Sequence, residues 1–389
     1  MTESIYIKNL GPVKDIYIEN IKPFTVLIGE SGSGKSTLMK AIALMRWIYK
    51  MHNIRSYLKH SNISKSPFRW RMETYLKNCG FEQFIKTDTE IIYTTNFESG
   101  KSYQTKFIRN KLLGTSNKEL RNELINKEDI CFNKISFVSE TRNIIPLWSD
   151  KGASFTGGYL GFYFHEVYRD FVLASETLRE LELPFLNLKF AIKKTNSGKK
   201  YTIQSSTNDV FEIDFKNSSS GTQTSVPISL IAQYFSKKFN FEDAFNRSVL
   251  NYLSNTDNLT DFKAVKNLSE INKKIFIHIE EPELSLFPDA QTQLINDLVN
   301  KCFITNDNSI ELFLSTHSPY IINHLNLLLK AFDKDKLIGG AKIDYDKLAV
   351  YQVVNGKLEN LMTQNERLVN TNPLSETINN IYDQYAALD

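Results

Sequence analysis

The sequence predicts an α/β fold in which buried strands end in loops of polar residues, and three features predict it. An apolar run at 24–28 (FTVLI) is followed by the loop GESGSGKS at 29–36 and by helical spacing of apolar residues at 37–44. A β-rich apolar run at 274–279 ends in EEPE at 280–283, and a third run ends in STHSP at 315–319. Each run has the length and composition of a buried strand.

The loop at 29–36 fits the P-loop pattern G-x-x-x-x-G-K-[ST] at every fixed position, and it lies between a strand and a helix as that motif requires. Its backbone N–H groups and the helix N-terminus favour phosphate. We therefore expect ATP and Mg²⁺ as cofactors, with Lys35 on the β- and γ-phosphates and the Ser36 hydroxyl on the metal. A Gly/Ser turn that contains a lysine by chance is the alternative, and both flanks disfavour it. The expected nucleotide-binding residues are Gly29, Glu30, Ser31, Gly32, Ser33, Gly34, Lys35, Ser36 and Thr37.

The acidic residues after the run at 274–279 fit a Walker B site. Glu280 is expected to hold the Mg²⁺ shell, and Glu281 to orient or polarise the attacking water. Adjacent carboxylates beside a core strand are costly unless a metal or hydrogen-bond donors balance them. The alternative is an acidic helix N-terminus, and a competing assignment makes Glu283 the catalytic acid.

Two further polar turns are candidate parts of the site, one directly after a predicted strand and one at the start of a predicted helix. His317 comes directly after a predicted strand, where an imidazole beside the γ-phosphate can accept from water or donate to a phosphate oxygen. The turn SSSGTQ at 218–223 opens an apolar helix and is a candidate anion cradle, although a plain loop with an N-cap serine explains it equally well.

The order P-loop, SSGTQ, EEPE and STHSP resembles the ABC-type ATPase heads of the RecF/SMC/OLD group. Within that group it is most similar to small bacterial ATPases of anti-phage defence, the OLD-like ATPases and the AriA subunit of PARIS. The opening segment 5–14 and the segment 350–358 are also similar to the family, so the resemblance spans most of the chain.

The resemblance implies that Ser220, Gly221 and Gln223 form the ABC signature and face the γ-phosphate of a partner protomer. Thr222 replaces a glycine of the commonest ABC transporter form. Members of the family often have the motif EEPExHLHP, whereas here Ser285 and Phe287 stand at the two histidine positions.

The segment 135–142 stands where ABC proteins have a Q-loop, but it contains no glutamine. Glu140 is a candidate for a metal or water role there. Arg142 is expected either to touch phosphate or to pair with an acid.

Composition favours a cytoplasmic protein. The 389 residues are 41% hydrophobic and 23% charged, with a net charge of +3 that does not by itself indicate nucleic acid. We expect no membrane partner, because no apolar run of about 18 residues occurs, and no signal peptide. The three cysteines, far apart and odd in number, predict neither disulfides nor a zinc site.

Basic and aromatic residues are interleaved between Arg46 and Lys77. Such a segment can bind nucleic acid, dock an acidic partner, or form an insertion with a solvated basic face and an aromatic core. These alternatives stay open at this point, and no nucleic-acid-binding motif selects among them. The basic members are Arg46, Lys50, Arg55, Lys59, Lys65, Arg69, Arg71 and Lys77, and the aromatic members are Trp47, Tyr49, Tyr57, Phe68, Trp70 and Tyr75.

We predict one ATPase spanning 1–389 with three regions added to its opening strands and first helix. They are a basic helical insertion plus a β-hairpin at 46–130, a helical/β subdomain with the signature loop at 155–255, and a C-terminal α/β part at 274–389. The subdomain is expected to hold a helix from about 160 to 182, three antiparallel strands at 186–192, 201–204 and 210–215, and helices over 226–255. A long coiled coil is excluded, because no heptad run separates 142 from 218.

These features predict an ATPase that forms a head-to-tail homodimer or higher oligomer around ATP and regulates a separate effector, with a TOPRIM or other nuclease as the expected class. The segment after His317 is too short for a TOPRIM domain of its own. The alternative function is a RecF-like DNA-binding clamp in repair or recombination.

Overall fold

The computed structural model describes residues 1–61, 72–108, 111–113, 124–149, 162–196, 198–206, 211–253 and 271–388. Its centre is a six-stranded sheet in the order β15-β14-β3-β13-β12-β7. The strands β14, β3, β13, β12 and β7 are parallel, and β15 pairs antiparallel at one edge. All parallel strands therefore end at the same edge of the sheet, which is where an α/β fold binds its ligands. The central strands are β3 (Phe24–Ile28), β7 (Cys131–Val138), β12 (Asn272–Glu280), β13 (Ile310–Thr316), β14 (Leu348–Val354) and β15 (Lys357–Asn360).

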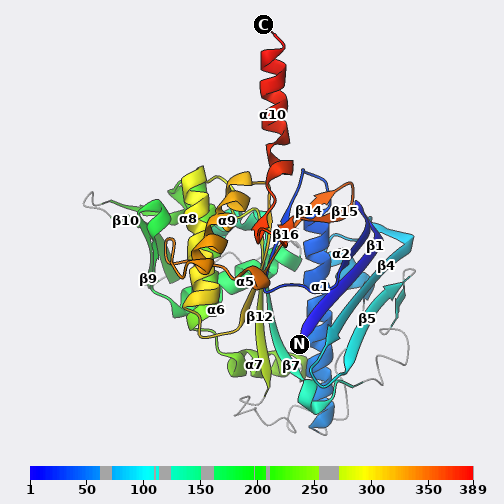
Figure 1. The fold of residues 1–389 in the computed structure, drawn as a ribbon. Helices are drawn as coiled ribbons and strands as arrows, with labels where there is room; N and C mark the ends of the chain where they lie inside the picture. Colours follow the sequence, from blue (N-terminus) through cyan, green and yellow to red (C-terminus); the bar gives the residue numbers. More distant parts are fainter. Residues whose placement is uncertain are drawn as a thin grey trace.

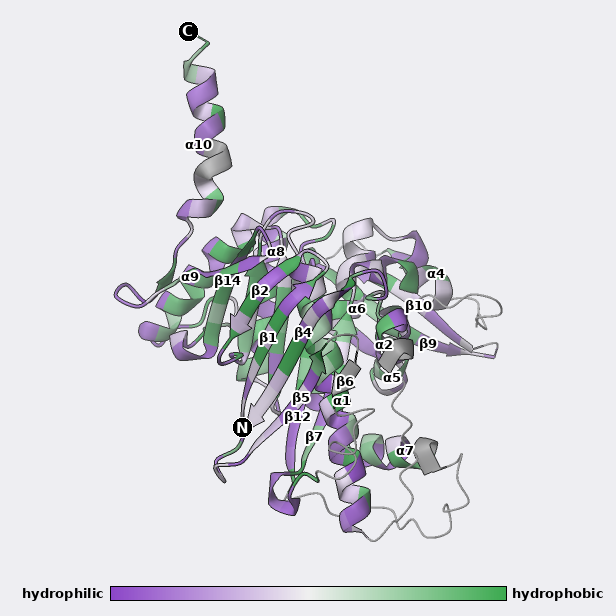
Figure 2. Cartoon of the chain, turned by 90° about the vertical axis from the view of Figure 1, so that its right-hand side faces the viewer, coloured by the Kyte–Doolittle hydropathy of each residue, from purple (hydrophilic) through white to green (hydrophobic). Residues whose placement is uncertain are grey.

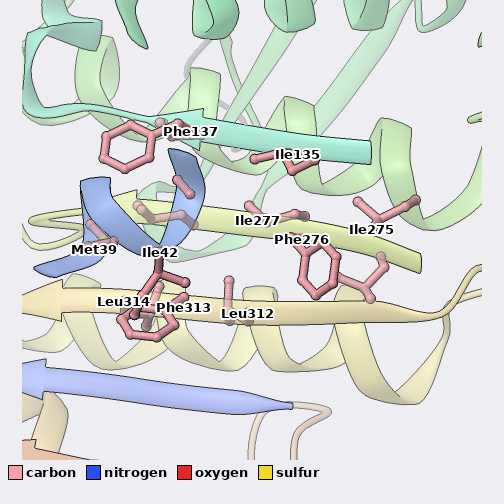
Figure 3. Close-up of a cluster of buried hydrophobic side chains, with 14 of the residues drawn as sticks. Met39, Ile42, Ile135, Phe137, Ile275, Phe276, Ile277, Leu312, Phe313 and Leu314 are labelled. Atoms are coloured by element: carbon pink, nitrogen blue, oxygen red, sulfur yellow. The ribbon is translucent and has the colours of Figure 1, made fainter. Parts of the chain in front are cut away.

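The predicted strands at 24–28, 274–279 and 313–316 are confirmed as β3, β12 and the end of β13. Every residue of β3, β7 and β13 is buried, as expected for strands covered on both faces. Helices lie on both sides of this sheet, with α1 (Lys35–His60) on one side and α6, α8 and α9 on the other (Figure 1). In Figure 3, Met39 and Ile42 of α1 lie over the apolar side chains of β7, β12 and β13.

A second, antiparallel sheet in the order β2-β1-β4-β5-β6 lies on the far side of α1 (Figure 1). It contains β1 (Thr2–Leu10), β2 (Val13–Ile18), β4 (Ile85–Asn96), β5 (Ser102–Ile108) and β6 (Lys111–Leu113). The predicted hairpin is confirmed, because β4 pairs with β5 from Glu90–Ile108 to Asn96–Ser102. A short helix α2 (Met72–Asn78) precedes β4, and α4 (Ile145–Ser149) follows β7.

A third sheet in the order β11-β10-β9-β8 carries the predicted antiparallel strands, with one addition. The helix expected from about 160 to 182 is described from Phe162 and ends at Thr177 as α5 (Phe162–Thr177), and the chain then forms β8 (Glu180–Leu183). The difference has a physical reason, because Leu181 and Leu183 alternate with exposed glutamates and fit a strand edge. The other strands are β9 (Leu188–Thr195), β10 (Gly198–Ser205) and β11 (Glu212–Asp214). The expected turns fall partly outside the described residues, at 197 and at 207–210.

The remaining helices pack around the central sheet, except the last one. They are α6 (Ser220–Lys237), α7 (Phe241–Leu253), α8 (Pro288–Val299), which continues into a π-helical turn at Asn300–Ile304, and α9 (Pro319–Asp333). A small strand pair, β16 (Met362–Thr363) and β17 (Leu368–Val369), leads to α10 (Asn372–Ala386), which projects away from the body (Figures 1 and 2). Within the part of the chain that the structure describes, no helix is long and apolar enough to cross a bilayer.

The structure buries several members of the interleaved basic and aromatic segment, which disfavours nucleic-acid binding or docking of an acidic partner by those residues. Arg46 is 1% exposed and is paired with Glu3 at 2.5 Å and with Glu311 at 3.3 Å between the two sheets. Arg55 is only 5% exposed. A buried guanidinium needs carboxylate partners, and these come from strands distant in the sequence, so the local pattern could not reveal them.

The aromatic members of this segment also pack inside the protein. The Trp47 ring lies 4.6 Å from that of Tyr75, and Tyr49 lies 6.1 Å from Tyr93. They form an aromatic core rather than a stacking platform for bases. Lys65, Phe68, Arg69, Trp70 and Arg71 lie outside the described residues.

Candidate nucleotide-binding site

Four strand ends place the predicted site residues along one edge of the central sheet. The P-loop follows β3, Glu280 ends β12, His317 follows β13, and Glu140 follows β7. Ser315 of β13 pairs with both Glu280 of β12 and Leu27 of β3, so the three neighbouring strands end in register. The topology therefore brings together residues that are up to about 290 positions apart in the sequence.

The P-loop has the backbone conformation that its glycines permit. Gly29 has φ +153°, and a Cβ there would lie 2.5 Å from the Val353 carbonyl oxygen, so the loop passes directly under the end of β14. The Lys35 ammonium donates to the carbonyl oxygens of Gly29 and Glu30, both at 2.8 Å. Burial lowers the pKa of Lys35, whereas nearby Glu281 and Glu283 raise it. The lysine is thus held inside its own loop, next to the acidic end of β12.

Glu280 is the buried acid of the site. It is 1% exposed, and neither carboxylate oxygen has a hydrogen-bond partner among the described residues. The nearest ammonium is that of Lys40, 3.6 Å away. Burial, followed by the neighbouring Glu140 carboxyl, raises the pKa of Glu280 to about 8, and the Ser36 hydroxyl acts in the opposite direction. Interaction with Glu280 in turn lowers the pKa of Glu140.

These residues fit a magnesium ion. Two buried carboxylate oxygens without partners, a serine hydroxyl beside them and a second carboxyl form the kind of oxygen-donor set that Mg²⁺ takes together with nucleotide phosphates. Among the residues described, no group of three or more His, Cys, Asp or Glu side chains could hold a metal ion. A metal bound here would therefore depend on the phosphates for much of its coordination.

Glu281 has a strained backbone that two contacts hold in place. Its φ is +44°, a region that costs a residue with a side chain about 1–3 kcal/mol. Its N–H donates to the Ser315 carbonyl at 2.8 Å, and its carbonyl accepts from Arg142 at 2.6 Å. The side chain is 38% exposed, and its Oε1 lies 3.5 Å from His317 Nε2. Glu281 and His317, predicted separately from two motifs, are neighbours facing solvent.

Glu283 occupies a different position from Glu281. Its Oε1 accepts from the His317 backbone N–H at 2.6 Å, while its Oε2 has no partner among the described residues. Burial raises the pKa of Glu283. The carboxyl therefore fixes the turn that carries His317, and this geometry favours Glu281 over Glu283 as the acid that reaches water.

Arg142, for which phosphate contact or acid pairing was expected, makes its hydrogen bonds in the structure to main-chain carbonyls. Its guanidinium is buried and donates to four main-chain carbonyls: Ser139 at 3.0 Å, Thr224 at 2.9 Å, Glu280 at 2.7 Å and Glu281 at 2.6 Å. Burial lowers the pKa of Arg142 to about 10. We call this arrangement the Arg142 clamp, because it joins the ends of β7 and β12 to helix α6.

The predicted signature loop opens α6 as expected, and its residues differ in exposure. Ser219 caps the helix, accepting from the Thr222 N–H, and Ser220 is exposed. Gly221 is buried, and a Cβ there would lie 2.7 Å from the Ser285 carbonyl oxygen. The Gln223 amide donates to the carbonyls of Lys216 and Ser218, at 2.8 and 2.9 Å. Gly221 and Gln223 thus support the loop from within, and contact with a partner's nucleotide stays a prediction for all three signature residues.

A cavity of about 750 Å³ opens beside the P-loop. It is lined by P-loop residues 30–33, by the β14–β15 turn, by Pro12 and Lys14, and by Pro373 and Asn380 of α10. Its size lies within the usual range for ligand pockets.

The sequence analysis did not identify Lys40 or the cavity residues outside the P-loop as part of the site. The position of Lys40, one helical turn after Ser36 on the same face, was the available signal.

Comparisons with known proteins find similarity to ATPase domains. Residues 4–195 match a family model described as an AAA domain, and residues 170–322 match one described as an AAA ATPase domain. These matches to ATPase domains imply ATP binding and hydrolysis. The fold is that of an α/β P-loop ATPase head, as the sequence predicts. No curated protein matches the chain.

Among solved structures, the chain is similar to an SMC head domain from Thermotoga maritima, with a TM-score of 0.36, 12% identity and coverage of 92% of this chain and 98% of that one. It is also similar to an SMC head bound to the C-terminal winged-helix domain of ScpA, with a TM-score of 0.36, 12% identity and coverage of 94% and 98%. A third similar structure is the recombination mediator RecF with a bound ATP analogue, with a TM-score of 0.35, 9% identity and coverage of 92% and 98%.

Proposed function

We propose that this protein is an ABC-type ATPase that dimerises head to tail around ATP and uses the closing and opening of the dimer to regulate a separate effector. The observation that carries the proposal is the single edge where the P-loop, Glu280, Glu281 and His317 meet, with two carboxylate oxygens on Glu280 that have no hydrogen-bond partner among the described residues. When bound, Mg²⁺ would supply electrostatic stabilisation of the charge that develops during phosphoryl transfer. Ser36 and Glu280 would hold it.

Each protein group has a defined task in this proposal. Lys35 and the P-loop N–H groups bind the phosphates, and Glu281 accepts a hydrogen bond from the attacking water and orients it. His317, 3.5 Å from Glu281, positions that carboxylate or the γ-phosphate. The exposed Ser220 of the partner would complete the site. Catalysis in this scheme is positioning and electrostatic stabilisation rather than covalent chemistry.

The test uses Glu281→Gln, which keeps the size of the side chain but cannot accept a proton. We expect this variant to bind ATP, to lose turnover by about 10²-fold or more, and to accumulate as a closed dimer in ATP. Light scattering with and without ATP measures the dimer, and Lys35→Ala in ATP is the control that should remain open. Normal turnover in Glu281→Gln together with an inactive Glu283→Gln would reverse the assignment.

The effector function rests on the sequence resemblance to defence ATPases. We propose that a nuclease partner, of the TOPRIM or another class, carries the destructive chemistry. The purified chain is then expected to cut neither DNA nor RNA with Mg²⁺ or Mn²⁺, with or without ATP. Nuclease activity that is abolished together with ATPase activity in Glu280→Gln would contradict a separate effector. The burial of Arg46 and Tyr49 removes support for a RecF-like DNA clamp that uses the basic segment.

A further inference from the structure

A second cavity lies far from the nucleotide edge, between α1, α5, α7 and β7. It has a volume of about 270 Å³ and is lined by four basic side chains and one acidic one. The basic residues are Lys50, Lys134, Arg169 and Arg247, and the acidic residue is Glu166. Lys50 follows Lys35 by 15 positions on the same helix, so the cavity is about 22 Å along α1 from the P-loop lysine.

Two of the basic side chains are held by acids. Lys134 donates to both carboxylate oxygens of Asp170, at 2.7 and 2.9 Å, and Arg169 pairs with Glu166 at 2.5 Å. These pairs neutralise Lys134 and Arg169 and fix them in the wall. The cavity therefore keeps a surplus of two positive charges, those of Lys50 and Arg247.

Lys50 carries one of the two positive charges of the cavity wall that are not balanced. Its ammonium makes no hydrogen bond or ion pair with the described residues. Burial, together with the nearby Lys134 and Arg169, lowers the pKa of Lys50 to about 8. Lys50 is partly buried at the cavity wall, so its ammonium has lost part of its hydration, and a bound anion would compensate for that loss. Arg247 lies in the same wall, beside the Tyr234 hydroxyl.

The other walls are apolar. Trp47, Leu173 and Phe239 line the same cavity, and a recess of about 30 Å³ next to it shares Lys50 and Phe239 and adds Phe132 and Phe245. An anion site with an adjoining aromatic recess suits a ligand that joins a compact anionic group to a small apolar one. At about 270 Å³ the cavity lies just below the usual range for ligand pockets, about 300–1,000 Å³, so it can hold only a small molecule.

We propose that this cavity binds a small phosphorylated molecule, with the phosphate on Lys50 and Arg247 and the organic group against Trp47 and Phe239. Phosphate is favoured over a carboxylate because its several oxygens and double charge match two cations, on α1 and α7, for which the described residues provide no carboxylate ion pair. Of the basic and aromatic residues in segment 46–77, Trp47 and Lys50 line this cavity. The proposal is independent of the nucleotide site.

The test titrates phenyl phosphate into the full-length protein by calorimetry. All proteins carry Lys35→Ala, so that phosphate binding at the P-loop is weakened. We expect saturable binding that falls at least about tenfold in Lys50→Met and also falls in Arg247→Met, because each removes a charge-assisted contact. Lys330→Met, which removes an exposed lysine of α9, is the matched control and should bind normally.

Unfolding by urea checks that the variants are folded. Without ligand, Lys50→Met should be about as stable as its parent, because methionine keeps the apolar stem and removes a partly buried charge that makes no ion pair with the described residues. Absence of phenyl phosphate binding, or equal affinity in the parent, Lys50→Met and Arg247→Met, overturns the proposal. Benzoate binding as tightly as phenyl phosphate overturns the assignment of the ligand as a phosphate.

Discussion

Replacing Arg142 with methionine should destabilise the protein strongly, because the variant leaves four buried carbonyl groups without their donor. Methionine fills a similar volume but donates no hydrogen bond. A hydrogen bond from a charged donor contributes about 1.5–3 kcal/mol, and part of that is regained if water or neighbouring N–H groups reach the freed carbonyls. Taking about 1 kcal/mol for each of the four contacts gives a loss of about 4 kcal/mol.

The assay is urea unfolding at 25 °C without nucleotide. The control is Arg367→Met, since Arg367 is 45% exposed and its nearest acid, Asp333, is 4.0 Å away. That substitution should change the free energy of unfolding by no more than about 0.5 kcal/mol. Equal unfolding midpoints for the Arg142 and Arg367 variants would refute the reasoning, because the clamp would then contribute no more than a surface arginine.

Three other substitutions test the nucleotide site. Lys35→Ala should abolish tight ATP binding, and equal affinity by calorimetry would contradict the P-loop assignment. Without metal, the Glu280→Gln variant should become more stable relative to the wild type as the pH rises from about 5 to 8. The raised pKa of Glu280 means that the folded wild type favours the neutral acid and loses stability as it ionises; parallel pH profiles from urea unfolding would refute this. Ser220→Arg should bind ATP without hydrolysing it, and mixing it with Lys35→Ala should restore partial turnover, since both lesions then fall on one composite site. No recovery in demonstrated heterodimers would contradict a role in trans.

The sequence predicts much of the sheet and the residues along its edge. Buried parallel strands are readable as apolar runs, and the polar residues that follow them must meet at one edge. Glu280, Glu281 and His317 were identified in this way, and the structure brings the latter two within 3.5 Å of each other. A motif at the end of a buried parallel strand therefore predicts which residues, although distant in the sequence, lie close together in the fold.

Contacts that depend on distant or main-chain partners were not predictable. Arg142 was assigned a phosphate or acid partner, but its acceptors are carbonyl oxygens, which every residue carries and no sequence pattern distinguishes. The burial of Arg46 was not predictable, because its partners, Glu3 and Glu311, are 43 and 265 positions away. The sequence analysis placed most of β8 at the end of a longer predicted helix, because a strand of four residues has too few positions to show its alternating pattern.

The projecting helix α10 affects how the size of the protein in solution should be measured. Its 15 residues extend about 22 Å, and Ile381, Tyr382 and Tyr385 are each more than 60% exposed. A compact body with such an arm has more friction than a sphere of equal mass, so it elutes early from a sizing column. A monomer could then be mistaken for a larger species by elution volume alone. Light scattering or sedimentation equilibrium, which report mass independently of shape, are the appropriate measurements for this chain.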